Sequence, residues 1–462
     1  MVRVITQDTY DEVVKDNIEE FDMTTEEAIK EAVAQFEAQG VDLSNIIKDL
    51  ALSSGNNHLI SITVEKLKEI CQTKDDDNLM LNELDTLMAE CKKDIAHRIR
   101  AGKEGAYNIL NDLLETKFRV YMQEKNKQNE LFIIKVLKCL TVLMDMQPDL
   151  LDDKGMEIMK SILDTVDNEN ILIATLQWIS TCCLRHEMNR QGIFAKNITA
   201  NLKELLKKSE NKKLLSETLL VIRRLTLDDD IRVEFGKAHE HARDLGVNLV
   251  ETLDDLLKEH QRPPLVGELL QTQTALLVRH ELCARARPAL AALLADNYDD
   301  AAVAAPAARL ITALAGNDDV KRQIVKSGVV PVIVSLLKRH NNNPTTTASI
   351  LKCISALCLR EASHGKMFIE NGAAEAIVES LNVHTDVAAV QKNGCWAVRN
   401  MVARYREHNA KFQELGIEAA LNKAYEKFGH DFGFDIKSAL RDLECDVKFD
   451  EQWKGKGVQI DQ

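Results

Sequence analysis

Two clusters of ligand-type side chains stand out in the sequence. The first, His239-Glu240-His241, carries two imidazoles that could bind a metal ion. Residues i and i+2 of a helix point apart, however, and no further ligand follows at helical spacing. The second, Asp228-Asp229-Asp230, lacks the ligand spacing and the closing glutamate of an EF-hand calcium loop. We therefore interpret the histidines as part of a solvent-facing or hydrogen-bonded insert, and the aspartates as a solvated helix N-cap.

The adjacent cysteines Cys182 and Cys183 lie inside a predicted helix, with His186 close by in the sequence. A catalytic thiol needs a nearby histidine or a helix N-terminus to lower its pKa, and closeness in sequence is weak evidence for either. The chain has 10 cysteines and no C-x-x-C pair. We interpret the cysteines as buried apolar residues in a reducing compartment. The sequence also lacks a phosphate-binding loop, a nucleophile elbow and a zinc-protease helix, so we expect no catalysis, no metal and no cofactor.

The composition narrows the class of protein further. The formal net charge is −14, which argues against a nucleic-acid binder because such a protein usually needs a large basic surface. No stretch of 18 apolar residues occurs, and residue 1 is not followed by a basic and then apolar segment, so we expect no membrane span and no signal peptide. These features predict a soluble intracellular protein, cytoplasmic and/or nuclear. We also expect it to be a monomer.

A repeated unit organises the chain and is clearest in residues 390–428. That stretch contains three amphipathic segments, which break near Tyr405 and at Gly416. Three glycines, Gly328, Gly372 and Gly416, follow one another at intervals of 44 residues. Gly246, Gly192, Gly155 and Gly105 continue the series less evenly, with Pro288 where another glycine would stand.

Separated segments also match one another directly. Residues 137–143 resemble residues 351–357, and residues 179–185 (Ile-Ser-Thr-Cys-Cys-Leu-Arg) resemble residues 354–360 (Ile-Ser-Ala-Leu-Cys-Leu-Arg). The second offset is 360 − 185 = 175 residues, close to four units of 44. A period just above about 40 residues with three helices is typical of armadillo or HEAT repeats.

Two motifs resemble the armadillo-repeat family: Gly328-Val-Val-Pro331 is similar to its turn into the second helix, and Cys395-Trp-Ala-Val-Arg-Asn400 to its third helix. The resemblance covers roughly residues 40–445 and implies an all-α, armadillo/HEAT-like right-handed α-solenoid with a helical N-terminal cap. It also implies that third helices line a concave groove in which asparagines bind the backbone of extended peptides. This chain has one such tryptophan–asparagine pair, whereas capture of nuclear-import cargo uses several in succession, so we do not expect that cargo.

The predicted domains are a helical cap or arm over residues 1–40, a solenoid of about nine units over residues 41–445, and a disordered tail over residues 446–462. Capping-box patterns at Thr9 to Glu12 and Thr24 to Glu27 predict two helix starts in the first segment. This segment is acidic, so the alternative to a cap is an autoinhibitory or partner-docking arm. An insertion near residues 228–245 lengthens one unit and is expected to project from one face.

Aligning the repeats places mostly polar or basic side chains in rows along the predicted groove. The groove candidates are Lys138, Gln177, Arg223, Arg224, Gln271, Arg309, Lys352, Trp396, Arg399 and Asn400. The candidates in the insertion are Asp228, Asp229, Asp230, Arg232, Lys237, His239 and His241. Arginine can bind carboxylates or phosphates through two parallel hydrogen bonds. A plainly solvated set of helix faces would show the same pattern.

The sequence therefore predicts a non-enzymatic scaffold or adaptor that binds an extended or acidic segment of a protein partner along the groove. One alternative is a nucleic-acid-associated protein that uses the basic rows, and its binding would fall steeply with salt. Another is a regulatory subunit or a chaperone for a specific client.

Overall fold

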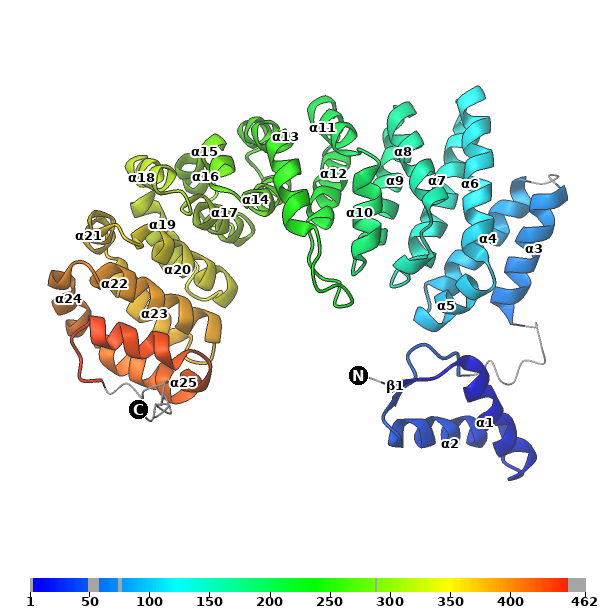
Figure 1. The fold of residues 1–462 in the computed structure, drawn as a ribbon, viewed down its shortest axis with the longest axis horizontal. Helices are drawn as coiled ribbons and strands as arrows, with labels where there is room; N and C mark the ends of the chain where they lie inside the picture. Colours follow the sequence, from blue (N-terminus) through cyan, green and yellow to red (C-terminus); the bar gives the residue numbers. More distant parts are fainter. Residues whose placement is uncertain (1–2, 49–57, 74–76, 287–288, 448–462) are drawn as a thin grey trace, which may run out of the picture. The chain divides into compact units, whose positions relative to one another are not determined.

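The computed structural model describes residues 3–48, 58–73, 77–286 and 289–447. The chain divides into two compact units, Met1–His241 (unit 1) and Ala242–Gln462 (unit 2). Each is built mainly from helices that follow one another along the chain (Figure 1). The predicted tail falls almost wholly outside the described residues, as does Pro288.

The elements of unit 1 are β1 (Arg3–Val4), α1 (Gln7–Glu19), α2 (Thr25–Ala38), β2 (Val41–Asp42), α3 (Leu59–Thr73), α4 (Asp77–Cys91), α5 (Ile95–Lys103), α6 (Ala106–Gln123), α7 (Lys127–Leu143), η2 (Pro148–Leu150), α8 (Asp153–Thr165), α9 (Glu169–Cys182), α10 (Glu187–Ala195), α11 (Thr199–Lys208) and α12 (Lys212–Leu225). Helix α13 (Ala238–Glu259) begins in unit 1 and continues into unit 2.

The further elements of unit 2 are α14 (Leu265–Leu276), α15 (His280–Arg285), α16 (Leu290–Asp296), α17 (Ala301–Leu314), α18 (Asp318–Lys326), α19 (Val329–Arg339), α20 (Pro344–Cys358), α21 (Ala362–Glu370), α22 (Ala373–Val383), α23 (Ala388–Val402), η3 (Arg406–His408), α24 (Asn409–Glu414) and α25 (Ile417–Asp442).

The N-terminal segment forms a small helical pair with its own core. Helices α1 and α2 pack together, and Tyr10, Val14 and Phe36 are buried between them. Within the described ranges, β structure is confined to the parallel pairing of β1 with β2. The capping box predicted at Thr24 is confirmed, because the Thr24 hydroxyl accepts from Glu27 N–H and the Glu27 carboxylate accepts from Thr24 N–H.

The capping box predicted at Thr9 is wrong. Helix α1 starts three residues earlier, because the Thr6 hydroxyl accepts a hydrogen bond from the backbone N–H of Thr9 at 3.3 Å. Thr9 is thereby the third residue of the helix, and its hydroxyl bonds to that of Thr6. Two threonines three residues apart offered alternative caps, and the pattern alone did not choose between them.

Replacing Thr24 by alanine is expected to destabilise the start of α2 by about 1 kcal/mol, because the backbone N–H of Glu27 loses its cap and the Glu27 carboxylate loses its hydrogen bond from the Thr24 hydroxyl. Hydrogen exchange at residues 25–30 should therefore accelerate roughly fivefold at this cost. Thr25→Ala is the matched control, since Thr25 is exposed and lies one residue beyond the cap. Equal acceleration in both variants would contradict the assignment.

Glycines in a left-handed conformation start one helix in several repeats. Gly328, Gly372 and Gly416 have φ of 87°, 83° and 76° and precede α19, α22 and α25, as their spacing predicted. Gly105 (φ 87°) precedes α6 in the same way. A Cβ would strain this backbone conformation, so glycine is favoured there.

The rest of the glycine series is not part of this pattern. Gly155, Gly192 and Gly246 lie inside α8, α10 and α13. Just before α11 the left-handed position is taken by Asn197, with φ of 58°. Asparagine tolerates this conformation better than most residues, because its short polar side chain can bond locally. At this turn of unit 1 the left-handed position is therefore kept by another residue type, and no glycine marks it.

The helices that carry the predicted rows pack one beside the next within each unit. In unit 1, α7 contacts α4 and α9, and α9 contacts α12. In unit 2, α14 contacts α17, α17 contacts α20, and α20 contacts α23. We call α7, α9, α12, α14, α17, α20 and α23 the row helices.

All ten cysteines are free, and eight of them are buried. Burial raises the pKa of the Cys183 thiol to about 12, and it also raises that of Cys182. A thiol is nucleophilic only as the thiolate, so this burial makes both groups unreactive at neutral pH. None of the described helices is long and apolar enough to cross a membrane.

Candidate functional site

In unit 1 the predicted row residues differ in how free they are. Lys138 on α7 is exposed, whereas Gln177 on α9 donates from Nε2 to Glu217 Oε1 of α12 at 2.6 Å. Arg223 and Arg224 on α12 are half-buried, and Arg224 Nε is enclosed with no hydrogen-bond partner among the described residues. Lys138 is thus the most accessible of these four side chains.

In other repeats, threonines stand at the positions that align with Arg399 or Asn400, and their hydroxyls turn back onto their own helices. Thr141, Thr181, Thr274 and Thr312 each donate to the carbonyl four residues earlier, at 2.7–3.0 Å. Such hydroxyls are already satisfied and offer a partner less hydrogen bonding than their residue type suggests. Much of this row therefore contributes shape rather than polar recognition.

In unit 2 the predicted residues share the accessible side of α14, α17, α20 and α23. Gln271 and Lys352 are exposed, and Arg309 Nη1 lies 3.4 Å from Ser349 Oγ of α20. The Lys392 ammonium lies 5.0 Å from the ring centroid of Trp396, within cation–π range. This side of unit 2 carries more free positive charge than the rows of unit 1.

Asn400 does not stand free for a ligand backbone. Its Nδ2 donates to the carbonyl of Ser355 at 2.9 Å and to Ser355 Oγ at 3.0 Å. The amide N–H groups thus bridge α23 to α20. A partner that used Asn400 as the family resemblance implies would have to displace these bonds.

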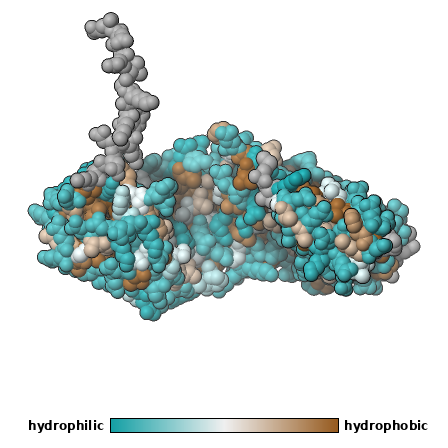
Figure 2. Space-filling view, turned by 90° about the horizontal axis from the view of Figure 1, so that it is seen from below, coloured by the Kyte–Doolittle hydropathy of each residue, from teal (hydrophilic) through white to brown (hydrophobic). Residues whose placement is uncertain are grey.

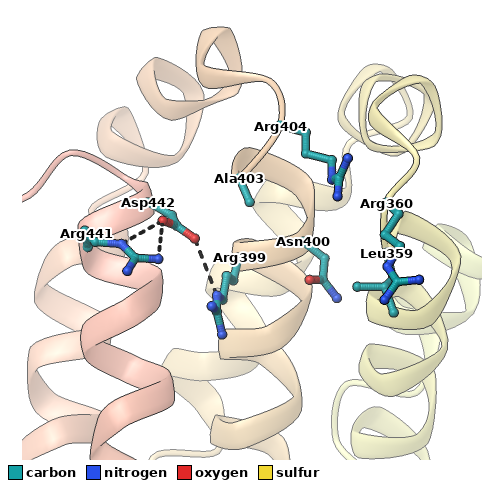
Figure 3. Close-up of a pocket in the computed structure, with 8 residues that line it drawn as sticks. All are labelled: Leu359, Arg360, Arg399, Asn400, Ala403, Arg404, Arg441 and Asp442. Carbon is teal, nitrogen blue, oxygen red and sulfur yellow. Dashed lines mark hydrogen bonds and ion pairs between the residues drawn. The ribbon is translucent and has the colours of Figure 1, made fainter.

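A pocket of about 600 Å³ lies beside Asn400, at the end of the unit 2 row. Its lining contains four arginines and one aspartate, and the residues come from the ends of α20, α23 and α25 (Figure 3). The lining residues are Leu359, Arg360, Arg399, Asn400, Ala403, Arg404, Arg441 and Asp442. We call this the arginine pocket.

Asp442 neutralises only part of the arginine pocket. Its carboxylate is buried and accepts from Arg441 Nε at 3.0 Å and Nη2 at 2.9 Å, and it lies 3.4 Å from Arg399 Nε. Arg360 and Arg404 are exposed and have no hydrogen bond or ion pair to any described residue, and no dashed line reaches either in Figure 3. The pocket thus holds net positive charge in a chain whose net charge is −14.

The insertion forms a strap over residues 228–237 that lies across two earlier turns of unit 1. Asp229 Oδ1 accepts from the backbone N–H of Arg185 at 3.1 Å, and Asp230 Oδ2 accepts from that of Glu187 at 2.9 Å. Arg232 donates to Asp230 at 2.8 Å and reaches Asp149, at the turn after α7, also at 2.8 Å. The strap is therefore fixed by polar contacts at both turns.

A buried ion pair supports the strap from below. Arg190 and Glu187 have side chains 1% exposed and lie 3.0 Å apart, and Arg190 Nη1 donates to Asp229 Oδ1 at 2.6 Å. The backbone N–H of Lys237 donates to Glu187 at 2.6 Å. The sequence interpretation of Asp228, Asp229 and Asp230 as a solvated helix N-cap is wrong. The next helix, α13, begins only at Ala238, and Asp229 and Asp230 accept bonds from the earlier turn, so only Asp228 of the three is exposed.

The two histidines of the insertion have different surroundings. His239 is exposed, whereas His241 is buried, stacks on Phe194 at 4.1 Å and lies 3.1 Å from the carbonyl of Leu225 through Nδ1. Burial lowers the pKa of the His241 imidazole. Over the described ranges, no group of three histidine, cysteine, aspartate or glutamate side chains is placed to hold a metal ion.

The strap is expected to loosen in acid. The hydrogen bond from Arg232, aided by the backbone N–H of Glu187, holds the pKa of Asp230 well below its ordinary value of 3.8. A depressed carboxyl pKa stabilises the fold fully above that ordinary value, and the stabilisation is lost as the pH falls below it. The protection of the amides at residues 185–187 against hydrogen exchange, relative to their intrinsic exchange rate at each pH, should therefore fall below that pH, and Asp230→Asn should remove this component. An unchanged acid dependence in the variant would rule out Asp230 as its source.

Several accessible residues escaped the sequence reasoning. Arg360 was used only as evidence of repetition, and Arg404 and Arg441 lie outside the aligned rows. The motif shared by residues 179–185 and 354–360 was the available signal, because it places Arg185 and Arg360 at the same point of their repeats. Ile231 and Phe235 project from the strap, at 101% and 84% exposure, without any periodic signal.

Accessible apolar side chains are otherwise scattered. On the face drawn in Figure 2, hydrophobic residues lie singly or in small groups among hydrophilic ones. Charge and hydrogen bonding are therefore the more distinctive features of that surface.

Comparison with known families covers nearly the whole chain. The model of a family described as ARMC6 matches residues 60–460, and that of the armadillo repeat-containing protein 6 N-terminal domain matches residues 2–72. The chain belongs to the armadillo repeat-containing protein 6 family. A Drosophila melanogaster homolog of that protein is 42% identical over 380 residues, 80% of this chain and 81% of the relative. The Homo sapiens protein is 32% identical over 389 residues, 79% of this chain and 75% of the relative.

Solved structures support the same architecture. An engineered protein superposes with a TM-score of 0.67 at 17% identity, over 95% of this chain and 99% of its own. A structure described as "A conserved phosphorylation switch controls the interaction between cadherin and beta-catenin in vitro and in vivo" gives a TM-score of 0.59 at 14% identity, over 95% and 81%. The predicted all-α solenoid of armadillo type is confirmed.

Proposed function

We propose that this chain is a non-enzymatic scaffold or adaptor that binds an acidic, extended segment of a partner protein on the row helices of unit 2. Armadillo-repeat families generally mediate protein–protein interaction and are typically not enzymes. The observation that carries the acidic preference is the arginine pocket, where four arginines face one aspartate in an acidic chain.

The rest of the unit 2 row favours the same kind of partner. Arg309 and Lys352 add accessible positive charge on the successive row helices α17 and α20. On the next row helix, α23, the half-buried Lys392 adds a further charge and Trp396 adds a flat apolar surface. Aromatic and arginine side chains contribute most where interfaces have hot spots. An extended acidic segment could contact several of these residues in succession.

Photo-crosslinking from two positions of unit 2 tests this proposal. A benzoylphenylalanine at Lys352, exposed on row helix α20, should cross-link to a protein whose contacted segment is acidic when mapped by mass spectrometry. The matched control is the same group at Glu379, which is exposed on α22. Adding Arg309→Glu to the Lys352 probe should reduce the cross-link.

Two results would overturn the proposal. One is equal cross-linking to the same protein from Glu379, since binding would then not depend on the row. The other is a cross-linked species that a nuclease digests and that disappears steeply with salt, because the ligand would then be a nucleic acid.

A further inference from the structure

Unit 1 shows how a turn of this fold holds an acidic segment. After row helix α9 the chain turns through Arg185, whose φ is 51°. The strap lays Asp229 and Asp230 against this turn, and their carboxylates accept from the N–H groups of Arg185 and Glu187. Two adjacent carboxylates thus each accept a hydrogen bond from one backbone N–H group of the turn. The guanidinium of Arg190 adds a charge-assisted hydrogen bond to Asp229.

Unit 2 repeats the same turn without the strap. Arg360 follows row helix α20, stands 175 residues after Arg185 and also has a positive φ, 63°. Both turns also have a side-chain contact to the backbone carbonyl seven residues earlier. In unit 1, Asn189 donates to the carbonyl of Cys182, and in unit 2 the Nδ1 atom of His364 lies 2.8 Å from the carbonyl oxygen of Leu357. Within the part of the chain that the structure describes, nothing accepts from the N–H of Arg360 or of Ala362, the counterparts of the two filled N–H groups.

The residue facing this turn has the opposite charge in the two units. Asp229 stands 44 residues after Arg185, and Arg404 stands 44 residues after Arg360. The turn in unit 1 is therefore closed by a carboxylate, whereas that in unit 2 is lined on both sides by arginine (Figure 3). Two accessible guanidinium groups repel each other unless an anion lies between them.

We propose that the arginine pocket binds a partner peptide with adjacent carboxylates, in the manner in which unit 1 binds its own Asp229 and Asp230. The proposal rests on the proposed function and names the side chains of the acidic segment. One carboxylate lies between Arg360 and Arg404 and accepts from the N–H of Arg360, as Asp229 accepts from that of Arg185, and its neighbour accepts from the N–H of Ala362. Arg399 and Arg441 remain on Asp442 and keep the pocket positive.

A short probe peptide tests this pocket directly. A fluorescent peptide with the sequence of residues 227–231, Leu-Asp-Asp-Asp-Ile, is titrated against the full chain by polarisation. We expect saturable binding that weakens when salt rises from about 50 to about 300 mM. The peptide with asparagine for all three aspartates should bind about tenfold more weakly or not at all.

Variants locate the binding. Arg360→Gln with Arg404→Gln should weaken the aspartate peptide about tenfold or more. Arg339→Gln should leave it unchanged, because Arg339 is an exposed arginine of α19 outside the pocket lining. Both pocket arginines are exposed, so the double variant is expected to fold. A peptide with phosphoserine for Asp229 distinguishes the source of the anion. If it binds more tightly and still needs both arginines, the proposed ligand of the pocket is a phosphorylated residue and not a pair of adjacent carboxylates.

The inference fails if the aspartate peptide does not bind at about 1 mM, if the asparagine peptide binds equally, or if the double variant binds unchanged. Photo-crosslinking from Lys352 separates this failure from that of the proposed function. A persisting acidic cross-link with no peptide binding would remove the pocket assignment alone. Peptide binding without any row cross-link would remove the scaffold proposal and keep the pocket.

Discussion

Replacing Arg190 by methionine is expected to destabilise unit 1 by about 3 kcal/mol, because it leaves Glu187 as a buried charge without its cationic partner. The strap loses its bond from Arg190 to Asp229 at the same time. Hydrogen exchange between residues 182 and 195 should accelerate roughly 100-fold or more at this cost. The backbone N–H of Lys237 and the Gln191 amide still donate to Glu187, so we expect the low end of the range for broken buried pairs.

Two further variants distinguish charge from packing. Arg190→Met with Glu187→Gln removes both charges and should recover part of the loss, as a double-mutant cycle would show. Arg185→Met should have little effect, because the strap is held by the backbone N–H of Arg185 and not by its exposed side chain. If the double variant were no more stable than Arg190→Met alone, a stranded charge would not be the cause.

Replacing Trp178 by alanine should destabilise unit 1 by a similar amount, about 3–5 kcal/mol. Trp178 on α9 is fully buried, and its indole Nε1 donates to Met144 Sδ at 3.1 Å. The truncation opens a cavity in the stack of row helices that the neighbouring side chains only partly fill. Because repeat stability depends on contacts between neighbours, exchange should accelerate in α7 and α12 as well as in α9.

Trp396 provides the matched comparison for this prediction. It lies half-buried on α23, with Lys392 beside its ring. Trp396→Ala should cost roughly 1 kcal/mol or less of stability, while it weakens partner cross-linking from Lys352. Equal destabilisation by the two tryptophan variants would show that Trp396 is part of the core rather than of the binding surface.

Helix starts that repeat the same residue type at a fixed spacing could be predicted from the sequence. A helix start at which another residue type replaces glycine could not. Glycines 44 residues apart predicted the helix starts at Gly328, Gly372 and Gly416, because few other residues adopt the left-handed backbone conformation found there. Asn197 adopts the same left-handed conformation before α11 in unit 1, so no glycine stands at that turn. A search for regularly spaced glycines therefore does not detect this turn, although the helical architecture continues through it.

The candidate site was predictable to a smaller extent. Alignment predicted the rows and included Arg399, which lines the arginine pocket, but it treated threonine as a free polar residue. Thr141 and Thr312 are instead bonded to their own helices. It also missed that Asp229 and Asp230 are ligands of their own chain. Which polar groups remain unsatisfied depends on contacts between repeats, and a helical period carries no information about them.

The burial of eight thiols leaves this chain with a convenient chemistry for labelling. The two half-buried cysteines, Cys71 and Cys445, lie in different units. Their thiols should react first with a maleimide dye, since the other eight are shielded from solvent. With a fluorescence donor and an acceptor attached to these two cysteines, energy transfer would report any change in the distance between the two units when a partner is added.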